Sequence, residues 1–500
     1  MREKFRPQVA AIIDKTMEEM LADRSFAFRL WLFVFFLTLL VGLGVQLLVL
    51  PVLFPQWHGG NGLLVGIDSL NYHRDAANLA MRIHESGWSA WRSRPSGPPI
   101  VDLLTLLYFA VAPTPLVMLP LNAALQATAL LMLWRIIRRL LPRPREAALC
   151  VLPMMLSPTG AIWYCQILKD GFSIAGTLLF LDGWFGVYEG ARSANVRKTI
   201  LSASRCVVGA LLGWTLRPYT VSLTEAAACA MLLAAVLGMA ALRSDPTARA
   251  SVIPAFSTWF CIVLLLSPLV RLGGHDSDPP ASSAARNAPG QEGAAGPFER
   301  LQGKAAVSFE TRPLIGWHTA LWLPRLVERP FRLVSAVRDG FRLGYPDATS
   351  MIDADVSFHS VSDVVLYVPR ALQIGLLSPF PGQLSGSTTR AANNMMRRVS
   401  TVETVLVYFA FAGLPIALWR WRHRLQIWLA LTFCLAFVVI YSLTIPNVGS
   451  LYRARYPYVM TLAAIGLAGL LSLRARPAVV VDRDSERSET RRRRLDPAGL

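Results

Sequence analysis

Long apolar runs separated by short polar links recur along the whole chain of 500 residues. A helix needs about 20 apolar residues to cross a bilayer, at a rise of about 1.5 Å per residue. Ten segments meet this requirement, at 27–54, 115–134, 146–165, 170–189, 205–221, 223–242, 251–271, 401–419, 426–445 and 457–473. The pattern therefore predicts an all-α, polytopic integral membrane protein with about ten spans.

The amino-acid composition supports a membrane protein and limits the kinds of molecule that it is expected to bind. Apolar residues make up 53% of the chain, and only five of the 50 basic residues are lysine. Because arginines at the ends of spans interact with anionic headgroups, the net charge of +18 indicates a membrane surface, and no nucleic-acid partner is expected. The six cysteines lie in or beside apolar segments without metal-ligand spacing, so neither a metal site nor a cofactor is predicted.

Basic residues gather in alternate links of the ten-span arrangement. They lie in the N-terminal arm, in the links at 135–145, 192–205, 243–249 and 420–424, and in the C-terminal tail. The positive-inside rule places such links on the cytoplasmic side of the membrane. Both termini are therefore predicted to be cytoplasmic.

Five parts are predicted along the chain. They are a cytoplasmic amphipathic arm (1–26), a seven-span N-terminal module (27–271) with a first outer loop at 55–99, a long outer loop (272–400), a C-terminal three-span bundle (401–473) and a basic tail expected to be disordered (474–500).

Three shorter segments are assigned to the outer face. Residues 98–113 are apolar but short and are bracketed by prolines, which predicts an interfacial or re-entrant helix. Residues 322–344 alternate apolar and arginine positions at helical spacing, as in a helix that lies on the headgroups. Residues 364–382 are either interfacial or half of an extra hairpin.

Unusual polar residues fall at the predicted outer boundary of the membrane. Taken singly they have structural explanations, because aspartates cap helices and arginines at helix ends extend to headgroups. Taken together they predict one outward-facing site. These residues are Asp68, Tyr72, His73 and Asp75 after the first span, then Lys169 and Asp170, then Arg217 and Tyr219, and last Arg453 and Arg455.

Acidic groups and arginines at a headgroup plane suit a lipid-phosphate substrate. A polyprenyl-phosphate-linked sugar keeps its lipid in the bilayer and its phosphate at the interface. Arginine binds phosphate through paired hydrogen bonds and stabilises charge on a leaving phosphate. A nearby carboxylate can accept the proton of an attacking hydroxyl.

The stretch "DSLNYHRDA" places Asp68, Tyr72 and Ala76 at D-x-x-x-Y-x-x-x-A spacing. It resembles the first outer loop of GT-C-type membrane glycosyltransferases, whose acidic residue is usually the catalytic base. "LSPTGAIWYCQILKD" is similar to their third span, which ends in a second acidic residue. The resemblance covers roughly residues 27–240. It implies that Asp68 is the base and that Asp170 orients donor or acceptor.

"NVGSLYRARYPYV" resembles a late arginine–proline segment of bacterial polysaccharide-locus membrane proteins, which implies that Arg453 and Arg455 bind phosphate. The expected function is an inverting glycosyltransferase of the bacterial inner membrane that uses a polyprenyl-phosphate sugar and acts in envelope or exported polysaccharide assembly. Its expected partners are membrane lipid, a saccharide or glycolipid acceptor, and other polysaccharide-assembly proteins. The other expected substrate-binding residues are Tyr72, His73, Lys169, Arg217 and Tyr219.

Two alternatives stay open at the level of sequence. A polymerase or ligase of lipid-linked oligosaccharides is favoured if Arg325, Arg329 and Arg370 line the cavity and Asp68 does not. A transporter, or a non-catalytic partner of a synthase, is expected to carry charges near mid-membrane, where this sequence has few.

Overall fold

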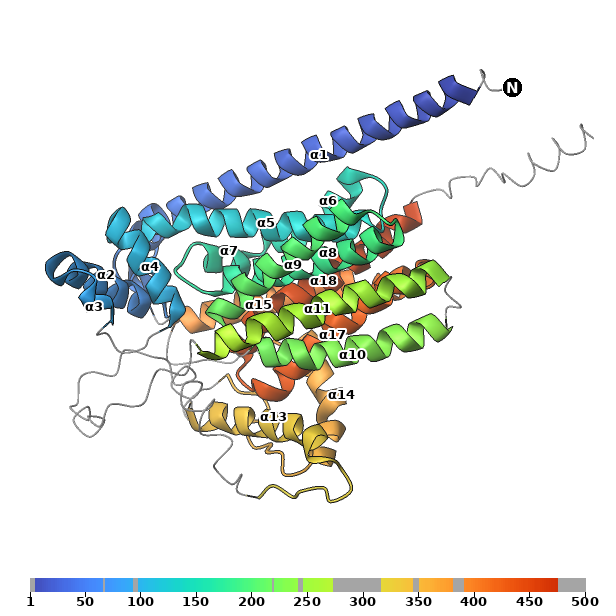
Figure 1. Ribbon diagram of the computed structural model, residues 1–500. Coiled ribbons are helices and arrows are strands. Elements are labelled where there is room, and N and C mark those ends of the chain that lie inside the picture. The colour runs from blue at the N-terminus through green and yellow to red at the C-terminus, as the bar shows by residue number, and fades with distance from the viewer. Residues whose placement is uncertain are drawn as a thin grey trace, which may run out of the picture.

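The computed structural model describes residues 5–65, 68–92, 98–217, 220–241, 246–272, 316–344, 350–380 and 391–474. Within these ranges the chain forms helices and no β-strand, apart from two isolated bridges. The all-α prediction is therefore confirmed. Most of the helices run side by side in a bundle, with α2, α3 and α4 at one end of it (Figure 1).

The helices fall into two groups along the chain. The N-terminal module contains α1 (Phe5–Gly44), the π-helix η1 (Val45–Leu53), η2 (Pro55–Trp57), α2 (Ser69–Ser86), α3 (Ser89–Arg92), α4 (Pro99–Ala110), η3 (Pro115–Met118), α5 (Leu119–Arg138), α6 (Pro144–Leu156), α7 (Pro158–Tyr164), α8 (Asp170–Arg192), α9 (Val196–Leu216), α10 (Thr220–Ala241) and α11 (Pro246–Leu272). The rest contains α13 (Arg325–Gly344), α14 (Val361–Leu377), α15 (Ala391–Phe411), α16 (Leu414–Arg420), α17 (Leu425–Thr444) and α18 (Val448–Arg474).

Several of these helices indicate a multi-pass membrane protein. Within the described ranges, six segments are long and apolar enough to cross a bilayer: Asp23–Leu53, Pro115–Arg138, Val196–Leu216, Arg398–Arg420, Leu425–Thr444 and Val448–Arg474. The predicted spans at 170–189, 223–242 and 251–271 are the helices α8, α10 and α11, which are not among those six. The count of ten spans and the side of the termini stay predictions.

The span predicted at 146–165 is broken, not straight. Helix α6 ends at Leu156, and α7 starts at Pro158 after a bend of 69°. Proline disfavours the helical conformation of the residue before it, and Ser157 before Pro158 is extended. The Ser157 hydroxyl accepts a hydrogen bond from Gly160 N and so caps the new helix.

The predicted arm and first span form one continuous helix, α1, which packs along α5. In Figure 1 the start of α1 and the last turns of α18 lie at the same end of the bundle, opposite α2–α4. The basic links meet at this end, because Arg424 donates to the carbonyl oxygen of Arg139, and Arg139 shares Glu189 with Lys198. The links assigned to one side of the membrane are therefore neighbours in space.

Glycines allow α8 and α9 to lie in close contact. A methyl group at Gly176 would stand 2.6 Å from the carbonyl oxygen of Gly209, and one at Gly209 would stand 2.5 Å from that of Gly176. Small residues permit such close approach between helices in a membrane. This contact fixes α8, and with it Asp170, against the end of α9.

The segments assigned to the outer face form helices of their own. Helix α4 has 12 residues, about 18 Å, which is too short for a hydrocarbon core of about 30 Å, and it packs on α2. Helices α13 and α14 lie together along one side of the bundle (Figure 1). Buried Arg338 joins this region to the bundle through the carbonyl oxygens of Asp353, Val356 and Leu443. Residues 273–315, 345–349 and 381–390 of the predicted long outer loop and residues 475–500 of the predicted tail lie outside the described residues.

Candidate anion-binding site

The candidate site is built on an irregular buried segment, residues 165–169, between α7 and α8. Irregular backbone inside a membrane protein requires hydrogen-bond partners, because no water is available to its carbonyl groups. Side chains of three other elements supply these partners. Asn122 donates to Tyr164 O and Gln166 O at 2.9 Å, Gln46 to Cys165 O at 2.6 Å, and Ser69 to Ile167 O at 3.1 Å.

Asp170 follows this segment and forms the centre of a charged cluster. Its carboxylate is 1% exposed, and Oδ1 accepts a hydrogen bond from Arg217 Nη2 at 2.6 Å. Arg453 Nη1 lies 3.6 Å from Oδ2, which has no hydrogen-bond partner among the described residues. The structure thus brings together three of the predicted site residues from α8, the end of α9 and α18.

The start of α2 lies against the same segment. Ser69 contacts Ile167, and Lys169 Nζ lies 6.0 Å from the centre of the buried Tyr72 ring. Asp68 is the half-buried residue before α2, and its side chain makes no capping hydrogen bond. The two predicted acidic residues therefore belong to segments that touch each other.

His73 is occupied by structural contacts. Nε2 pairs with Asn61 Nδ2 at 2.9 Å, and Nδ1 pairs with the Tyr108 hydroxyl at 2.7 Å. Burial lowers the pKa of His73, because the charged imidazolium is poorly solvated there. These contacts join the first loop, α2 and α4, so His73 has no ring nitrogen left for a substrate in this arrangement.

Arg453 and Arg455 point to different partners. Arg455 is buried and donates to Ile374 O at 2.9 Å, and also to the carbonyl oxygens of Gly375 and Ser378. It thereby satisfies the last carbonyl groups of α14 and does not join the Asp170 cluster. Residues two apart on a helix project about 200° apart, which explains the divergence. Tyr219 lies outside the described residues.

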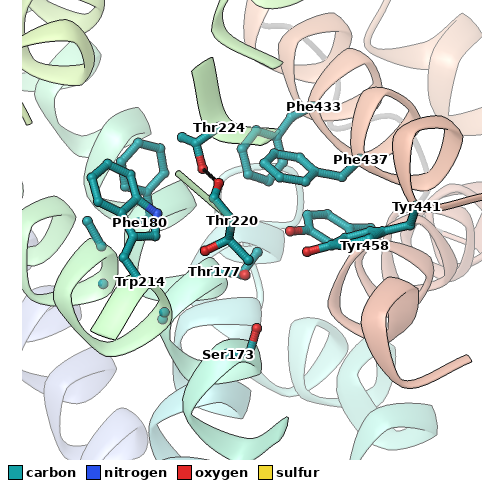
Figure 2. A pocket seen from close by; sticks show the side chains of 14 residues that line it. Ser173, Thr177, Phe180, Trp214, Thr220, Thr224, Phe433, Phe437, Tyr441 and Tyr458 are labelled. Carbon is teal, nitrogen blue, oxygen red and sulfur yellow. Dashed lines mark hydrogen bonds between the residues drawn. The ribbon is translucent and has the colours of Figure 1, made fainter. Parts of the chain in front are cut away.

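A pocket, drawn in Figure 2, is lined by residues that lie close in sequence to the members of the charged cluster. It has an empty volume of about 410 Å³, part of it open to the surroundings. Part of the wall comes from the elements that carry the charges: Ser173 follows Asp170 on α8, Trp214 precedes Arg217 and Tyr458 follows Arg453. The side chains drawn in Figure 2 combine hydroxyl groups with aromatic rings, namely Ser173, Thr177, Thr220 and Thr224 with Phe180, Trp214, Phe433, Phe437, Tyr441 and Tyr458.

Sequence reasoning missed a second buried aspartate on α8. Asp182 is fully buried, and its carboxylate binds Arg139 at 2.8 Å, Arg205 at 2.9 Å and Arg135 at 3.1 Å. A single carboxylate inside a predicted apolar span is itself the signal that could have revealed it. Asp182 is therefore an exception to the expectation that the interiors of the spans are nearly uncharged.

Glu403 on α15 was missed in the same way. Its carboxylate accepts from Thr159 N at 2.8 Å, the Tyr452 hydroxyl at 2.8 Å, the Ser157 hydroxyl at 3.1 Å and the Thr159 hydroxyl. These bonds hold the break between α6 and α7 against α15 and α18. Glu403 therefore positions α7, and through it the segment that leads to Asp170.

No protein-family model matches the sequence, and a search of curated proteins finds no match. In the part of the chain that the structure describes, no three His, Cys, Asp or Glu side chains are arranged to hold a metal ion. The function is therefore inferred from the residue resemblance and from the geometry of the site.

Proposed function

We propose that the protein is a membrane glycosyltransferase that transfers a sugar from a polyprenyl-phosphate donor to a saccharide or glycolipid acceptor. The observation that carries this proposal is the position of Arg217 and Arg453, which share buried Asp170 beside an aromatic pocket. A charged end and an apolar end in one site match a lipid that carries a phosphate.

Arg453 is the residue best placed to bind the phosphate. Its side chain is 30% exposed, and its one ion-pair contact with a described residue is the 3.6 Å approach to Asp170. The guanidinium group therefore keeps donors for phosphate oxygens, which it binds in a paired geometry. Arg217 adds a second positive charge to the same anion.

Asp170 serves in this proposal as a positioning residue. A carboxylate between two arginines is a poor proton acceptor, because both cations stabilise its charged form. Its role is to hold Arg217 and Arg453 at a common position. This leaves Asp68, on the adjacent start of α2, as the proposed base.

The proposed reaction has one displacement step. An acceptor hydroxyl attacks the anomeric carbon from the side opposite the phosphate, and the bond between that carbon and the phosphate oxygen breaks. The hydroxyl proton passes to Asp68, and the bonding electron pair leaves with the polyprenyl phosphate. Arg217 and Arg453 stabilise the negative charge on this leaving group, and the sugar is inverted.

The pocket is proposed to hold the first part of the polyprenyl chain. The rings of Phe433, Phe437 and Tyr458 pack on one another and form a rigid apolar wall. Gly176, Gly209 and Gly213 also line the pocket, and only at Gly213 is there open space where a side chain would begin.

The criterion for a polymerase or ligase is met only in part. Arg370 is bound to Asp353 through two nitrogens, at 2.9 and 3.0 Å, and none of Arg325, Arg329 and Arg370 lines the pocket. Asp68 does not line it either. We therefore retain the transferase as the proposal.

Reconstituted protein tests the function directly. Proteoliposomes receive short-chain polyprenyl-phosphate sugars with a radiolabelled sugar, together with envelope glycolipids as acceptors, and label is followed from the donor. Asp68→Asn is expected to lower transfer by at least about 100-fold, because the base is lost. Asp75→Asn, a partly exposed neighbour, serves as the matched control and should retain activity.

Two results would contradict the proposal. Full transfer by Asp68→Asn would remove that residue as the base. Absence of transfer from every donor, together with no lipid-linked saccharide accumulating in a deletion strain by mass spectrometry, would exclude a glycosyltransferase.

A further inference from the structure

The second half of α8, from Asp182 to Glu189, is surrounded by more positive charge than its carboxylates balance. Four cations surround two carboxylates: Arg135, Arg139 and Arg205 bind Asp182, and Arg139 and Lys198 bind Glu189. Asp182 lies 12 residues along α8 from Asp170, about 18 Å, so this cluster is separate from the proposed substrate site.

Two of these arginines retain hydrogen-bond donors. Arg135 uses Nε for Asp182, its side chain is 41% exposed, and no described residue accepts from its two terminal nitrogens. Arg205 uses one hydrogen of each terminal nitrogen, for Asp182 and Ser202, so each of these nitrogens keeps a second hydrogen, and the side chain is 24% exposed.

The two arginines are close enough to share one anion. Arg135 Nε and Arg205 Nη1 lie 3.1 and 2.9 Å from the same oxygen, Asp182 Oδ2, so they are no more than 6.0 Å apart. Two like charges at this distance repel each other, and one carboxylate shared with a third arginine offsets this only in part. A phosphate group would accept from both guanidinium groups and lower the repulsion.

The surroundings of Arg205 are apolar and exposed. Leu201, one turn before it on α9, is 57% exposed, and Val208, one turn after it, is 47% exposed. Residues three and four apart share a helix face, so these side chains flank the guanidinium group. In a membrane protein such a face contacts lipid, so the ligand that meets the arginines there is itself amphiphilic.

We propose that Arg135 and Arg205 bind the phosphate of an anionic phospholipid, whose acyl chains lie along the exposed apolar face of α9. Basic side chains between helices near the headgroup level recognise anionic lipids through this charge match. The bound lipid would stabilise the contact of α5, α8 and α9 around Asp182. This inference does not depend on the proposed glycosyltransferase activity.

The test uses the full chain purified in neutral detergent. Phosphatidylglycerol, phosphatidylcholine or inorganic phosphate is added, bound lipid is counted by native mass spectrometry, and the midpoint of thermal unfolding is measured. We expect phosphatidylglycerol to bind and to raise the midpoint, with little effect of the other two. Arg135→Gln should weaken phosphatidylglycerol binding about five-fold, the equivalent of about 1 kcal/mol per basic residue.

The controls separate the possible sources of the effect. Arg143→Gln removes the same charge from an exposed pair with Glu146 and should leave binding unchanged. Should Arg135→Gln fail to fold, Arg205→Lys provides the second variant, with the charge retained and the paired geometry lost. Equal binding of both lipids, unchanged binding in both variants, or equal stabilisation by inorganic phosphate would overturn the proposal.

Discussion

Helix α8 holds two buried aspartates among arginines, Asp170 at its first residue and Asp182 near its middle, and they differ in how completely the carboxylate is bonded. Both oxygens of Asp182 accept hydrogen bonds, from three arginines. Asp170 bonds Arg217 through one oxygen, and its other oxygen has no hydrogen-bond partner within the described ranges. A saturated carboxylate stabilises the fold, whereas an incompletely bonded one beside a pocket leaves capacity for a ligand.

The largest effect is expected at Asp182, both of whose carboxylate oxygens accept hydrogen bonds. Asp182→Asn leaves three arginines around a neutral side chain, and loss of a buried ionic partner costs about 3–5 kcal/mol. We expect a large fall in the free energy of unfolding, measured by denaturant titration in detergent with size-exclusion chromatography as the check on folding. A variant as stable as the wild type would show that the cluster contributes nothing to stability.

Asp170→Asn tests the same comparison at the carboxylate that is incompletely hydrogen-bonded. Transfer should fall by about 100-fold, because the two arginines lose their common anchor. The loss of stability should be smaller than for Asp182→Asn, since Arg453 is 30% exposed and can be solvated. The transfer rate and the free energy of unfolding are measured for both variants. Equal destabilisation by the two substitutions would show that Asp170 and Asp182 do not differ in their contribution to stability.

Arg453 and Arg455 form a matched pair for the next prediction. Arg453→Gln should reduce transfer about 10-fold to 100-fold with little change in unfolding, because a phosphate ligand is lost. Arg455→Gln should chiefly destabilise the protein, because the carbonyl groups at the end of α14 lose their donor. The reverse pattern of effects would assign phosphate binding to Arg455.

Gly213 offers a smaller perturbation of the pocket. A methyl group there would meet no atom within 4 Å, and Gly213 lines the pocket, so a larger side chain is expected to take up part of its space. Gly213→Leu is expected to slow transfer from long-chain donors about ten-fold and to spare short-chain analogues, because it fills the space proposed for the lipid. Gly213→Ala serves as control, and equal rates with both chain lengths would place the lipid elsewhere.

The smallest effect concerns His73, at the Asp170 end but outside the charged cluster. Its pKa is lowered by burial, so the unfolded chain binds the proton more readily. Stability should be complete above the ordinary pKa of about 6.5 and should fall as the pH drops towards the lower pKa of the folded state. Unfolding midpoints at pH 7.5 and 5.5 should differ more in the wild type than in His73→Gln.

Sequence patterns predicted the features that depend on composition and spacing. Apolar length identified the helices, and boundary position brought Asp170, Arg217 and Arg453 into one expected site, where the structure also places them. Spacing alone did not separate Arg453 from Arg455, because their roles depend on which helix faces each side of α18. Asp182 and Glu403 were missed because each is a single charged residue in a segment that is otherwise apolar. Their binding partners are distant in sequence, so the local pattern does not reveal them.

The order in which the chain is synthesised determines when each member of the Asp170 cluster becomes available. Segments emerge and insert from the N-terminus onward, so Gln46, Ser69 and Asn122 are available before the backbone that they hold. Arg217 follows soon after Asp170, whereas Arg453 arrives with the last helix. We therefore expect Asp170 to pair first with Arg217, and the docking of α18 to bring Arg453 to the carboxylate and Tyr458 to the pocket.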